Sequence, residues 1–197
     1  QFICYLIMLN CRFICFAGFI LKKKKVNTGG ETFKKPAIII ANHQSFLDIL
    51  LLLTLHPKMV MVTNEWVWRS PFFGAVIRYA GYFYTGEGYE NSVSHIKERI
   101  DEGYSVVIFP EGTRSYDGRL KRFHKGAFYL SEALKLDIIP IILYGTGMVI
   151  SKSQPFYLKR GIIATKILPR ITYEDRSFGN TYKERTKNTF NSSFKKF

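Results

Sequence analysis

The chain has 197 residues, of which 47% are apolar and 22% are charged. This length and composition suit one domain with a hydrophobic core and exclude a chain that is disordered throughout. Lys and Arg number 29 against 15 Asp and Glu, and the net charge of +14 favours an anionic partner: nucleic acid, an acidic protein or phospholipid headgroups.

The excess of positive charge lies at the two ends of the chain. Residues 1–35 contain seven basic and one acidic residue, residues 36–150 contain eleven of each, and residues 151–197 contain eleven basic and three acidic residues. A nucleic-acid-binding domain usually carries a basic face on its folded centre. A neutral centre with basic flanks instead suits an anionic membrane surface.

The first 21 residues are largely apolar: seventeen are apolar or Cys, and Arg12 is the one charged residue. A helix over this stretch would be about 30 Å long, close to the thickness of the hydrocarbon core of a bilayer. Asn10 and Arg12 near its middle would be costly inside lipid. A spanning helix, a helix lying in the membrane interface and a helix buried in the protein core therefore all remain open.

Four lysines at positions 22–25 follow the apolar segment, whereas a signal peptide carries its positive charges before it. Basic flanks stay on the cytoplasmic side, so we expect residues 1–25 to form a membrane-associated helix with a polybasic flank, on the cytoplasmic face of a membrane. The chain begins with Gln, and we expect it to be a piece of a longer protein.

All three cysteines, Cys4, Cys11 and Cys15, lie in the apolar segment, at spacings that place them on one side of a helix. The rest of the chain has no cysteine. This excludes a disulfide framework, a zinc site built on Cys and a cysteine nucleophile, and it fits a reducing compartment.

Residues 34–176 alternate between two apolar patterns. Short β-branched runs predict buried strands at 36–41, 59–63, 81–85, 105–109, 138–143 and 161–168. Helical periodicity predicts helices at 46–55, 66–79, 91–102 and 123–136. The repeated order predicts a layered α/β domain with a largely parallel sheet flanked by helices.

Two further features bear on the arrangement. Pro140 cannot donate a hydrogen bond to a neighbouring strand, so we expect the strand at 138–143 to lie at an edge of the sheet or to carry a bulge. Residues 177–197 are expected to form a basic, irregular or loosely helical tail. Its basic residues are expected to face lipid or solvent: Lys183, Arg185, Lys187, Lys195 and Lys196.

A histidine and an aspartate follow the first predicted strand of the domain. Within one continuous helix, His43 and Asp48 would point about 140° apart, so they meet only if the helix begins after His43. Ser45 is a suitable N-cap, with Asp48 three residues later as in a capping box. A carboxylate on one ring nitrogen prepares the other nitrogen to take a proton.

No G-x-S-x-G nucleophile elbow is present, so the simplest nucleophile is a hydroxyl of the substrate. The alternative is that Asp48 only caps a helix and His43 is an ordinary loop residue.

A second polar segment follows the strand at 105–109. Glu111 and Arg114 flank Gly112 in a tight turn, where Arg114 could hold a phosphate through its guanidinium fork. Downstream basic residues extend this positive region, and we include Lys121 and Lys125 among the expected substrate-binding residues. The alternative is a charged surface turn with a salt bridge between Glu111 and Arg114.

The two segments, in this order and each directly after a strand, resemble the glycerolipid acyltransferase (PlsC-like) family. Asn42, His43 and Asp48 match its NH-x-x-x-x-D block, residues 109–115 match its FPEGTRS block, and residues 138–142 look like its later hydrophobic block around a proline. The resemblance covers roughly residues 34–168.

The resemblance implies an O-acyltransferase that moves an acyl group from acyl-CoA or acyl-carrier protein to the free hydroxyl of a lysolipid such as 1-acylglycerol-3-phosphate. It implies that His43 is the catalytic base, that Asp48 orients it, and that no metal or cofactor is needed. The glycerol or phosphate part of the acceptor would be bound by Glu111, Gly112, Thr113 and Arg114.

One block departs from the family pattern. Where the family usually has an arginine credited with phosphate binding, this chain has Glu87. A carboxylate would repel a phosphate, which leaves open an acceptor with a cationic or zwitterionic headgroup, such as a monoacyl amino-acid lipid. A lipid-binding module without catalysis is a further alternative.

Overall fold

The computed structural model describes most of the chain: residues 2–17, 21–63, 65–71, 74–84, 89–115, 117–154 and 157–194. In this part, seven strands form one sheet in the order β1-β7-β6-β2-β5-β3-β4. Every neighbouring pair is parallel except β6 and β7, which are antiparallel. The strands are β1 Leu21–Asn27, β2 Ile38–Ala41, β3 Met59–Thr63, β4 Phe83–Tyr84, β5 Ser105–Ile108, β6 Ile138–Tyr144 and β7 Gly161–Ile167.

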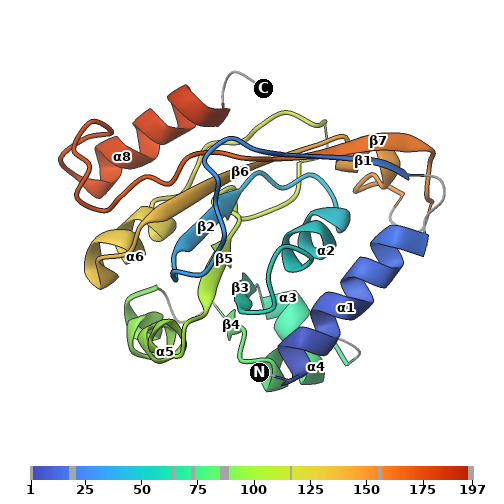
Figure 1. The fold of residues 1–197 in the computed structure, drawn as a ribbon, viewed down its shortest axis with the longest axis horizontal. Coiled ribbons are helices and arrows are strands. Elements are labelled where there is room, and N and C mark those ends of the chain that lie inside the picture. The colour runs from blue at the N-terminus through green and yellow to red at the C-terminus, as the bar shows by residue number, and fades with distance from the viewer. Residues whose placement is uncertain are drawn as a thin grey trace.

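Helices cover both sides of the sheet, with α1 and α2 on one side and α5 and α6 on the other (Figure 1). The predicted α/β architecture with a largely parallel sheet is therefore confirmed. The helices are α1 Phe2–Ala17, α2 Leu47–Leu53, α3 Glu65–Trp68, α4 Gly74–Tyr79, α5 Tyr89–Asp101, α6 Gly126–Leu134, α7 Thr146–Val149 and α8 Tyr182–Thr189, followed by the π-helical turn η1 Phe190–Phe194.

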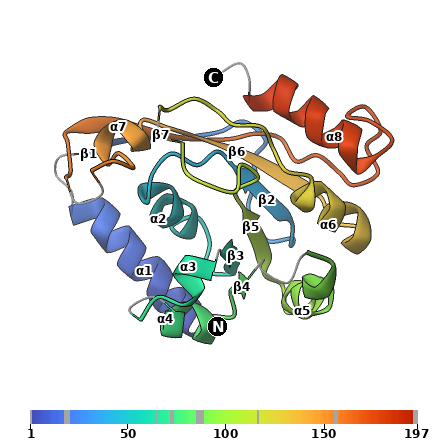
Figure 2. The ribbon, with the colours of Figure 1, turned by 180° about the vertical axis from the view of Figure 1, so that it is seen from behind.

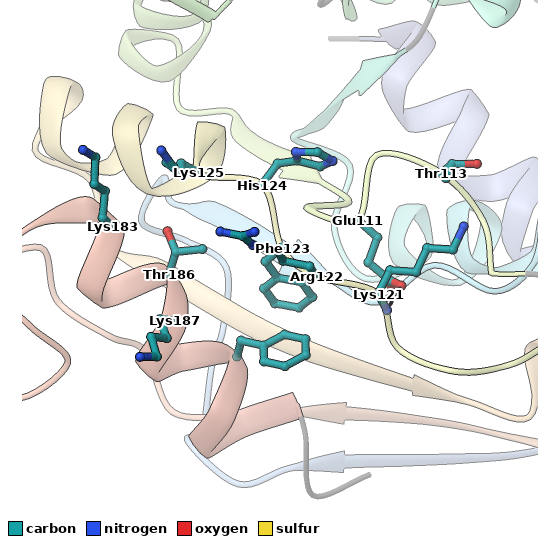
Figure 3. Close-up of a pocket in the computed structure, with 11 residues that line it drawn as sticks. Glu111, Thr113, Lys121, Arg122, Phe123, His124, Lys125, Lys183, Thr186 and Lys187 are labelled. Atoms are coloured by element: carbon teal, nitrogen blue, oxygen red, sulfur yellow. Dashed lines mark hydrogen bonds between the residues drawn. The ribbon is translucent and has the colours of Figure 1, made fainter.

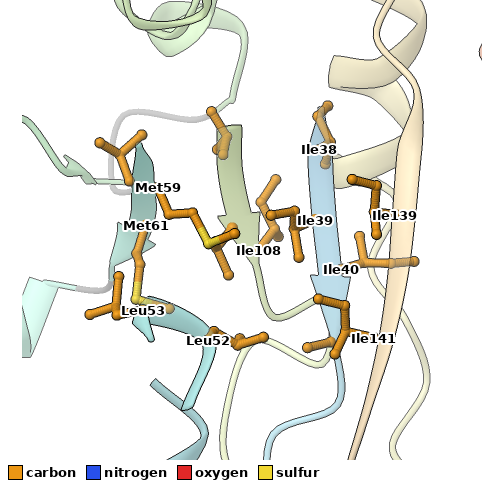
Figure 4. Close-up of a cluster of buried hydrophobic side chains, with 14 of the residues drawn as sticks. Ile38, Ile39, Ile40, Leu52, Leu53, Met59, Met61, Ile108, Ile139 and Ile141 are labelled. Atoms are coloured by element: carbon orange, nitrogen blue, oxygen red, sulfur yellow. The ribbon is translucent and has the colours of Figure 1, made fainter. Parts of the chain in front are cut away.

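The hydrophobic core surrounds the central strands. Strands of a parallel sheet that is covered on both faces are apolar at successive positions, and Ile38, Ile39 and Ile40 of β2 are all fully buried. Figure 4 shows these isoleucines between Ile139 of β6 and Ile108 of β5, with Leu52 of α2 further along. This packing fixes β2 and α2 relative to each other, and the loop between them carries His43.

Strand β1 is not predicted by the hydrophobic pattern. Its sequence contains the four lysines at 22–25, which are exposed, and it pairs with β7 at one edge of the sheet. Lysines on an edge strand hinder unwanted pairing with another chain. The polybasic segment is thus a strand of the sheet, and only backbone pairing places it there.

Pro140 lies in a strand that has neighbours on both sides, so the edge position predicted for it is wrong. The predicted irregularity is present instead. Ile141 pairs with Ile167 and Ile138 pairs with Ile171, so a step of three residues on β6 faces a step of four on the partner segment. This bulge lies just beyond the end of β7, where Pro140 accepts a hydrogen bond from the Leu168 amide (3.0 Å) and has none to give.

Two other predictions need correction. The single helix predicted at 66–79 is two short helices, α3 and α4, because Pro71 disfavours helical geometry at Ser70. In the tail, Arg185 does not face lipid or solvent. Its side chain is fully buried and donates to the carbonyl oxygens of Thr172 (2.9 Å) and Tyr173 (3.2 Å).

Helix α1 packs one face against the protein and exposes the other. Cys4, Met8 and Cys11 are buried, in agreement with the predicted common face, whereas Phe2 and Phe13 are exposed. The side chain of Cys15 lies outside the described residues. Among the helices that the structure describes, none has both the length and the apolar character needed to cross a membrane.

Candidate active site

The side chains of His43 and Asp48 meet at the carboxyl end of β2. Nδ1 of His43 lies 3.0 Å from Oδ2 of Asp48. This contact requires α2 to begin after His43, and the helix begins at Leu47. The predicted contact between the two side chains is therefore confirmed.

Asp48 is fully buried, and backbone amides hold it in place. Its Oδ2 also accepts hydrogen bonds from the amides of Gln44 (2.6 Å) and Ser45 (2.7 Å). A negative charge in the first turn of a helix is further favoured by the helix dipole. Because a carboxylate only accepts, Nδ1 of His43 carries the hydrogen and Nε2 is left as the acceptor.

The predicted capping box is only half present. Asp48 accepts from the Ser45 amide as predicted, but the Ser45 hydroxyl accepts from the amide of Leu47 (3.3 Å) rather than from that of Asp48. The hydroxyl also donates to the carbonyl oxygen of Ile150 (2.7 Å). Ser45 therefore ties the start of α2 to the end of α7.

The imidazole of His43 is stacked on Phe109, which directly follows β5. The ring centroids are 3.9 Å apart and the planes differ by 15°. The side chain of His43 is 13% exposed, and its Nε2 has no hydrogen-bond partner in the part of the chain that the structure describes. A substrate hydroxyl that reaches Nε2 would thus meet an oriented ring with a free lone pair.

Glu111 connects the two sequence blocks through the backbone. One carboxylate oxygen accepts from the amide of His43 (2.8 Å) and the other from the amide of Lys121 (2.8 Å). A third hydrogen bond joins the same two segments: the amide of Ser115 donates to the carbonyl oxygen of His43 (2.9 Å). Glu111 is only 3% exposed, so the alternative of a surface turn with a Glu111–Arg114 salt bridge is wrong.

The environment of Glu111 disfavours its charged form. Burial raises the pKa of its carboxyl above the ordinary value, and the negative charge of Asp48 acts in the same direction. The two backbone amides act against this shift. A carboxyl held in this way fixes the backbone at His43.

The turn after Glu111 is held by a lysine that the sequence analysis does not single out. Gly112 has φ +71°, a conformation that favours glycine, and a Cβ there would lie 3.4 Å from Cδ2 of His124. Lys152 donates from Nζ to Oγ1 of Thr113 (3.3 Å) and to the carbonyl oxygen of Arg114 (3.0 Å). Its distance in sequence from the block hides this contact.

A cavity of about 910 Å³ opens beside Glu111 (Figure 3). Four residues of the predicted substrate-binding set line it: Glu111, Thr113, Lys121 and Lys125. Gly112 and Arg114 are not among its lining residues. The cavity also receives Lys183 and Lys187 from α8. Their spacing of four residues on one helix face is the signal from which these two lysines could have been found.

A second cavity of about 790 Å³ lies along the same loop and is lined by Asn42, Gln44 and Ser115, together with side chains that follow β6. The side chain of Asn42 binds both backbone groups of Leu143 there: it donates to the carbonyl oxygen (2.8 Å) and accepts from the amide (2.7 Å). His43 lines neither cavity, but its chain neighbours line this one and its partner Glu111 lines the first.

Two further expectations stay untested: the role of Glu87 and the absence of a metal. Glu87, on which the alternative acceptor rests, lies outside the described residues. Within the described ranges, no three His, Cys, Asp or Glu side chains are arranged to hold a metal ion.

Comparisons with known proteins agree on one family. Residues 21–144 match the sequence model of a family described as Acyltransferase. A chloroplastic 1-acyl-sn-glycerol-3-phosphate acyltransferase of Arabidopsis thaliana is 34% identical over 130 residues, which are 64% of this chain and 36% of that protein. The 1-acyl-sn-glycerol-3-phosphate acyltransferase of Saccharomyces cerevisiae is 33% identical over 150 residues, 72% of this chain and 49% of that protein.

The fold also matches a solved structure. The crystal structure of the 1-acyl-sn-glycerophosphate acyltransferase PlsC from Thermotoga maritima has a TM-score of 0.76, with 23% identity, over 93% of this chain and 73% of that chain. At this identity the match concerns the fold alone. The chain spans between about a third and about a half of the length of the two curated relatives named above.

Proposed function

Because the chain belongs to the Acyltransferase family, we propose that it is an O-acyltransferase with His43 as its general base. The observation that carries the proposal is the contact of 3.0 Å between His43 Nδ1 and the buried carboxylate of Asp48. It leaves Nε2 as the atom that accepts a proton. The hydrogen bonds to Asp48 give this carboxylate the role of orienting the ring.

In the first step, Nε2 of His43 removes the proton from the hydroxyl of the acceptor lipid as the oxygen attacks the carbonyl carbon of an acyl thioester. The imidazole becomes positively charged, and the adjacent Asp48 carboxylate stabilises that charge. A tetrahedral intermediate forms with the negative charge on the former carbonyl oxygen.

In the second step, the intermediate collapses and the carbon–sulfur bond breaks. The thiolate leaves and receives the proton from Nε2, which restores the neutral imidazole. The products are an ester and a thiol, and no acyl group becomes attached to the protein. Holding the two substrates together in the correct orientation would supply much of the rate acceleration.

We take the acceptor to be 1-acylglycerol-3-phosphate, because the relatives from Arabidopsis thaliana and Saccharomyces cerevisiae carry that lipid in their names. Its glycerol phosphate would be bound by the turn after Glu111, through Gly112, Thr113 and Arg114. Lys121 and Lys125 extend the positive charge from this turn along the neighbouring cavity. An amino-acid lipid remains the alternative acceptor.

We also propose that the domain works at the cytoplasmic face of a membrane, with α1 in contact with lipid. The exposed aromatic side chains of Phe2 and Phe13 support this arrangement, since they would enter the interface between headgroups and acyl chains. The lysines of β1 follow in the chain and would meet anionic headgroups.

The experiment measures acyl transfer from a labelled thioester to a panel of lysolipids in detergent micelles. His43→Ala should lower kcat by about 10²–10⁴-fold, because it removes the base. Asp48→Asn keeps an oxygen for the backbone amides but removes the charge that stabilises the imidazolium, and a loss of similar size is expected.

Circular dichroism and the thermal midpoint must show that both variants fold. His95→Ala on the exposed surface of α5 is the matched control and should keep full activity. Transfer that survives in His43→Ala would contradict the proposal. Preference for an amino-acid lysolipid over lysophosphatidate would support the alternative acceptor.

A further inference from the structure

We propose that the cavity between α8 and the start of α6 binds the phosphate groups of a soluble nucleotide thioester, an acyl-coenzyme A. This inference rests on the proposed function and adds where the donor is held. We call the site the α8 groove and define it by four cationic side chains that line it: Arg122, Lys125, Lys183 and Lys187.

The α8 groove concentrates positive charge without neutralising it. All four side chains are exposed, and none has a hydrogen bond or ion pair in the part of the chain that the structure describes. The one carboxylate in the lining is Glu111, and both of its oxygens are occupied by backbone amides. Cations gathered at one cavity repel one another, and a ligand with several negative charges relieves that repulsion.

The walls of the groove are held apart at a fixed spacing. Phe123 packs edge to face against Phe190 and Phe194, with ring centroids 5.1 Å and 4.9 Å away. Tyr129 of α6 packs against Tyr182 of α8 with centroids 6.1 Å apart. Below them, buried Arg185 anchors α8 to the carbonyl oxygens of the segment after β7. The lysines of α8 are thus presented by a rigid wall, which lowers the entropic cost of binding.

The position of the groove favours a soluble ligand over a lipid surface. Helix α8 lies at one end of the molecule and α1, with its exposed Phe2 and Phe13, at the other end (Figures 1 and 2). A membrane that touches the apolar face of α1 would not reach α8. The lysines of α8 also lie outside residues 21–144, the part that matches the family, whereas the turn proposed above for the acceptor lies inside it.

The shape of the groove favours a small molecule over a carrier protein. Its volume of about 910 Å³ is in the range of cavities that enclose a cofactor-sized ligand, whereas proteins dock on broad surfaces. Glu111 lines the groove and holds the His43 amide, so the groove is continuous with the catalytic loop. A donor with its phosphates between α8 and α6 would extend its thioester along this loop toward His43.

The test measures binding of coenzyme A without an acyl group, so that it does not depend on turnover. Lys183→Gln/Lys187→Gln should raise the Kd for coenzyme A by about tenfold or more, because each lysine removed is a charge-assisted contact to phosphate. Pantetheine lacks the nucleotide phosphates, and its binding should not change. Lys34→Gln/Lys35→Gln makes the same charge change just before β2, at the opposite end of that strand from His43, and should leave the Kd for coenzyme A unaltered.

Kinetics provide the second readout. In the α8 variant, KM for acyl-coenzyme A should rise while KM for the lysolipid and kcat with acyl-pantetheine stay constant. An unchanged Kd for coenzyme A would overturn the inference. So would an effect confined to acyl-carrier protein, to the lysolipid or to anionic vesicles. If coenzyme A binds as expected but no lysolipid is acylated, the proposed function fails and the α8 groove still stands.

Discussion

Three neighbours constrain His43, and each fixes something different: the tautomer, the plane of the ring or the position of the backbone. The Asp48 carboxylate selects the tautomer, the Phe109 ring at 3.9 Å sets the plane of the imidazole, and the Glu111 carboxylate holds the backbone amide. A base must lie within hydrogen-bond reach of the proton that it removes, and small displacements cost rate. We therefore expect these three residues to influence the proposed reaction through the position of His43.

Glu111→Gln tests the two hydrogen bonds that Glu111 accepts from the backbone amides of His43 and Lys121. A glutamine offers one oxygen where the glutamate offers two, so either the His43 or the Lys121 amide would face an NH2 group. We expect a loss of about 1–3 kcal/mol in the free energy of unfolding. The displacement of His43 should lower kcat by about ten- to a hundredfold. Urea unfolding and steady-state kinetics measure the two effects, with Glu98→Gln on the exposed face of α5 as the control.

The pH dependence of Glu111→Gln is a separate prediction. Burial raises the pKa of Glu111, so between its ordinary value and the raised one the folded state binds more protons than the unfolded state. Stability of the wild type relative to the variant should then fall as pH rises through that window. A relative stability that rises instead would show that the carboxylate is stabilised by its surroundings.

At the scale of elements, the turn between β6 and α7 decides where the wall of the second cavity lies. Asn42 bridges both backbone groups of Leu143 at the end of β6, and Gly145 follows two residues later. Gly145 has φ +78°, and a Cβ there would lie 2.1 Å from the carbonyl oxygen of Ile162. The chain needs glycine for its conformation and for its close approach to β7.

Gly145→Ala should destabilise the protein by more than about 2 kcal/mol, since it combines an unfavourable backbone conformation with a contact against backbone atoms. Gly30→Ala is the matched control. Its φ is +63°, but a Cβ there meets nothing within 4 Å, so only the conformational cost of about 1 kcal/mol is expected. Thermal or urea unfolding compares the two, and equal losses would contradict the steric explanation.

At the scale of the whole molecule, one ion-pair cluster ties together segments that are distant in sequence. Arg170, which follows β7, contacts Glu31 before β2 (3.0 Å) and Asp137 before β6 (3.3 Å). The cluster lies at the amino ends of β2 and β6, while His43 follows the carboxyl end of β2. The ion-pair cluster and the proposed catalytic groups thus lie at opposite ends of the strands of the sheet.

Glu31→Gln should change the dependence of stability on pH in the sense opposite to Glu111→Gln. Burial alone would raise the pKa of Glu31, but the Arg170 guanidinium and the Phe33 amide outweigh it and hold that pKa below its ordinary value. The stabilisation is fully present above the ordinary pKa and is lost as pH falls through the lowered one. Urea unfolding from pH 7 down to pH 3 should show the wild-type advantage shrinking, and a constant advantage would contradict the assignment.

Much of this fold could be predicted from local patterns. The apolar runs at 38–41, 59–63 and 105–108 are strands because nearly all of their side chains are buried in a covered parallel sheet. The helical repeat set the condition for a contact between His43 and Asp48, since only a helix that begins after His43 brings them together, and α2 begins at Leu47. The periodicity could not predict β1, which holds its place through backbone pairing with β7.

Neighbours close along the chain are enough to predict most strands and helices of residues 34–176, the family blocks and the condition under which His43 meets Asp48. Three features depend instead on contacts between distant segments: the buried carboxylate of Glu111, the position of Pro140 inside the sheet, and the approach of Lys183 and Lys187 to the cavity beside Glu111. Burial and long-range hydrogen bonds depend on which segments the sheet brings together, and the type of a residue does not specify its distant partner.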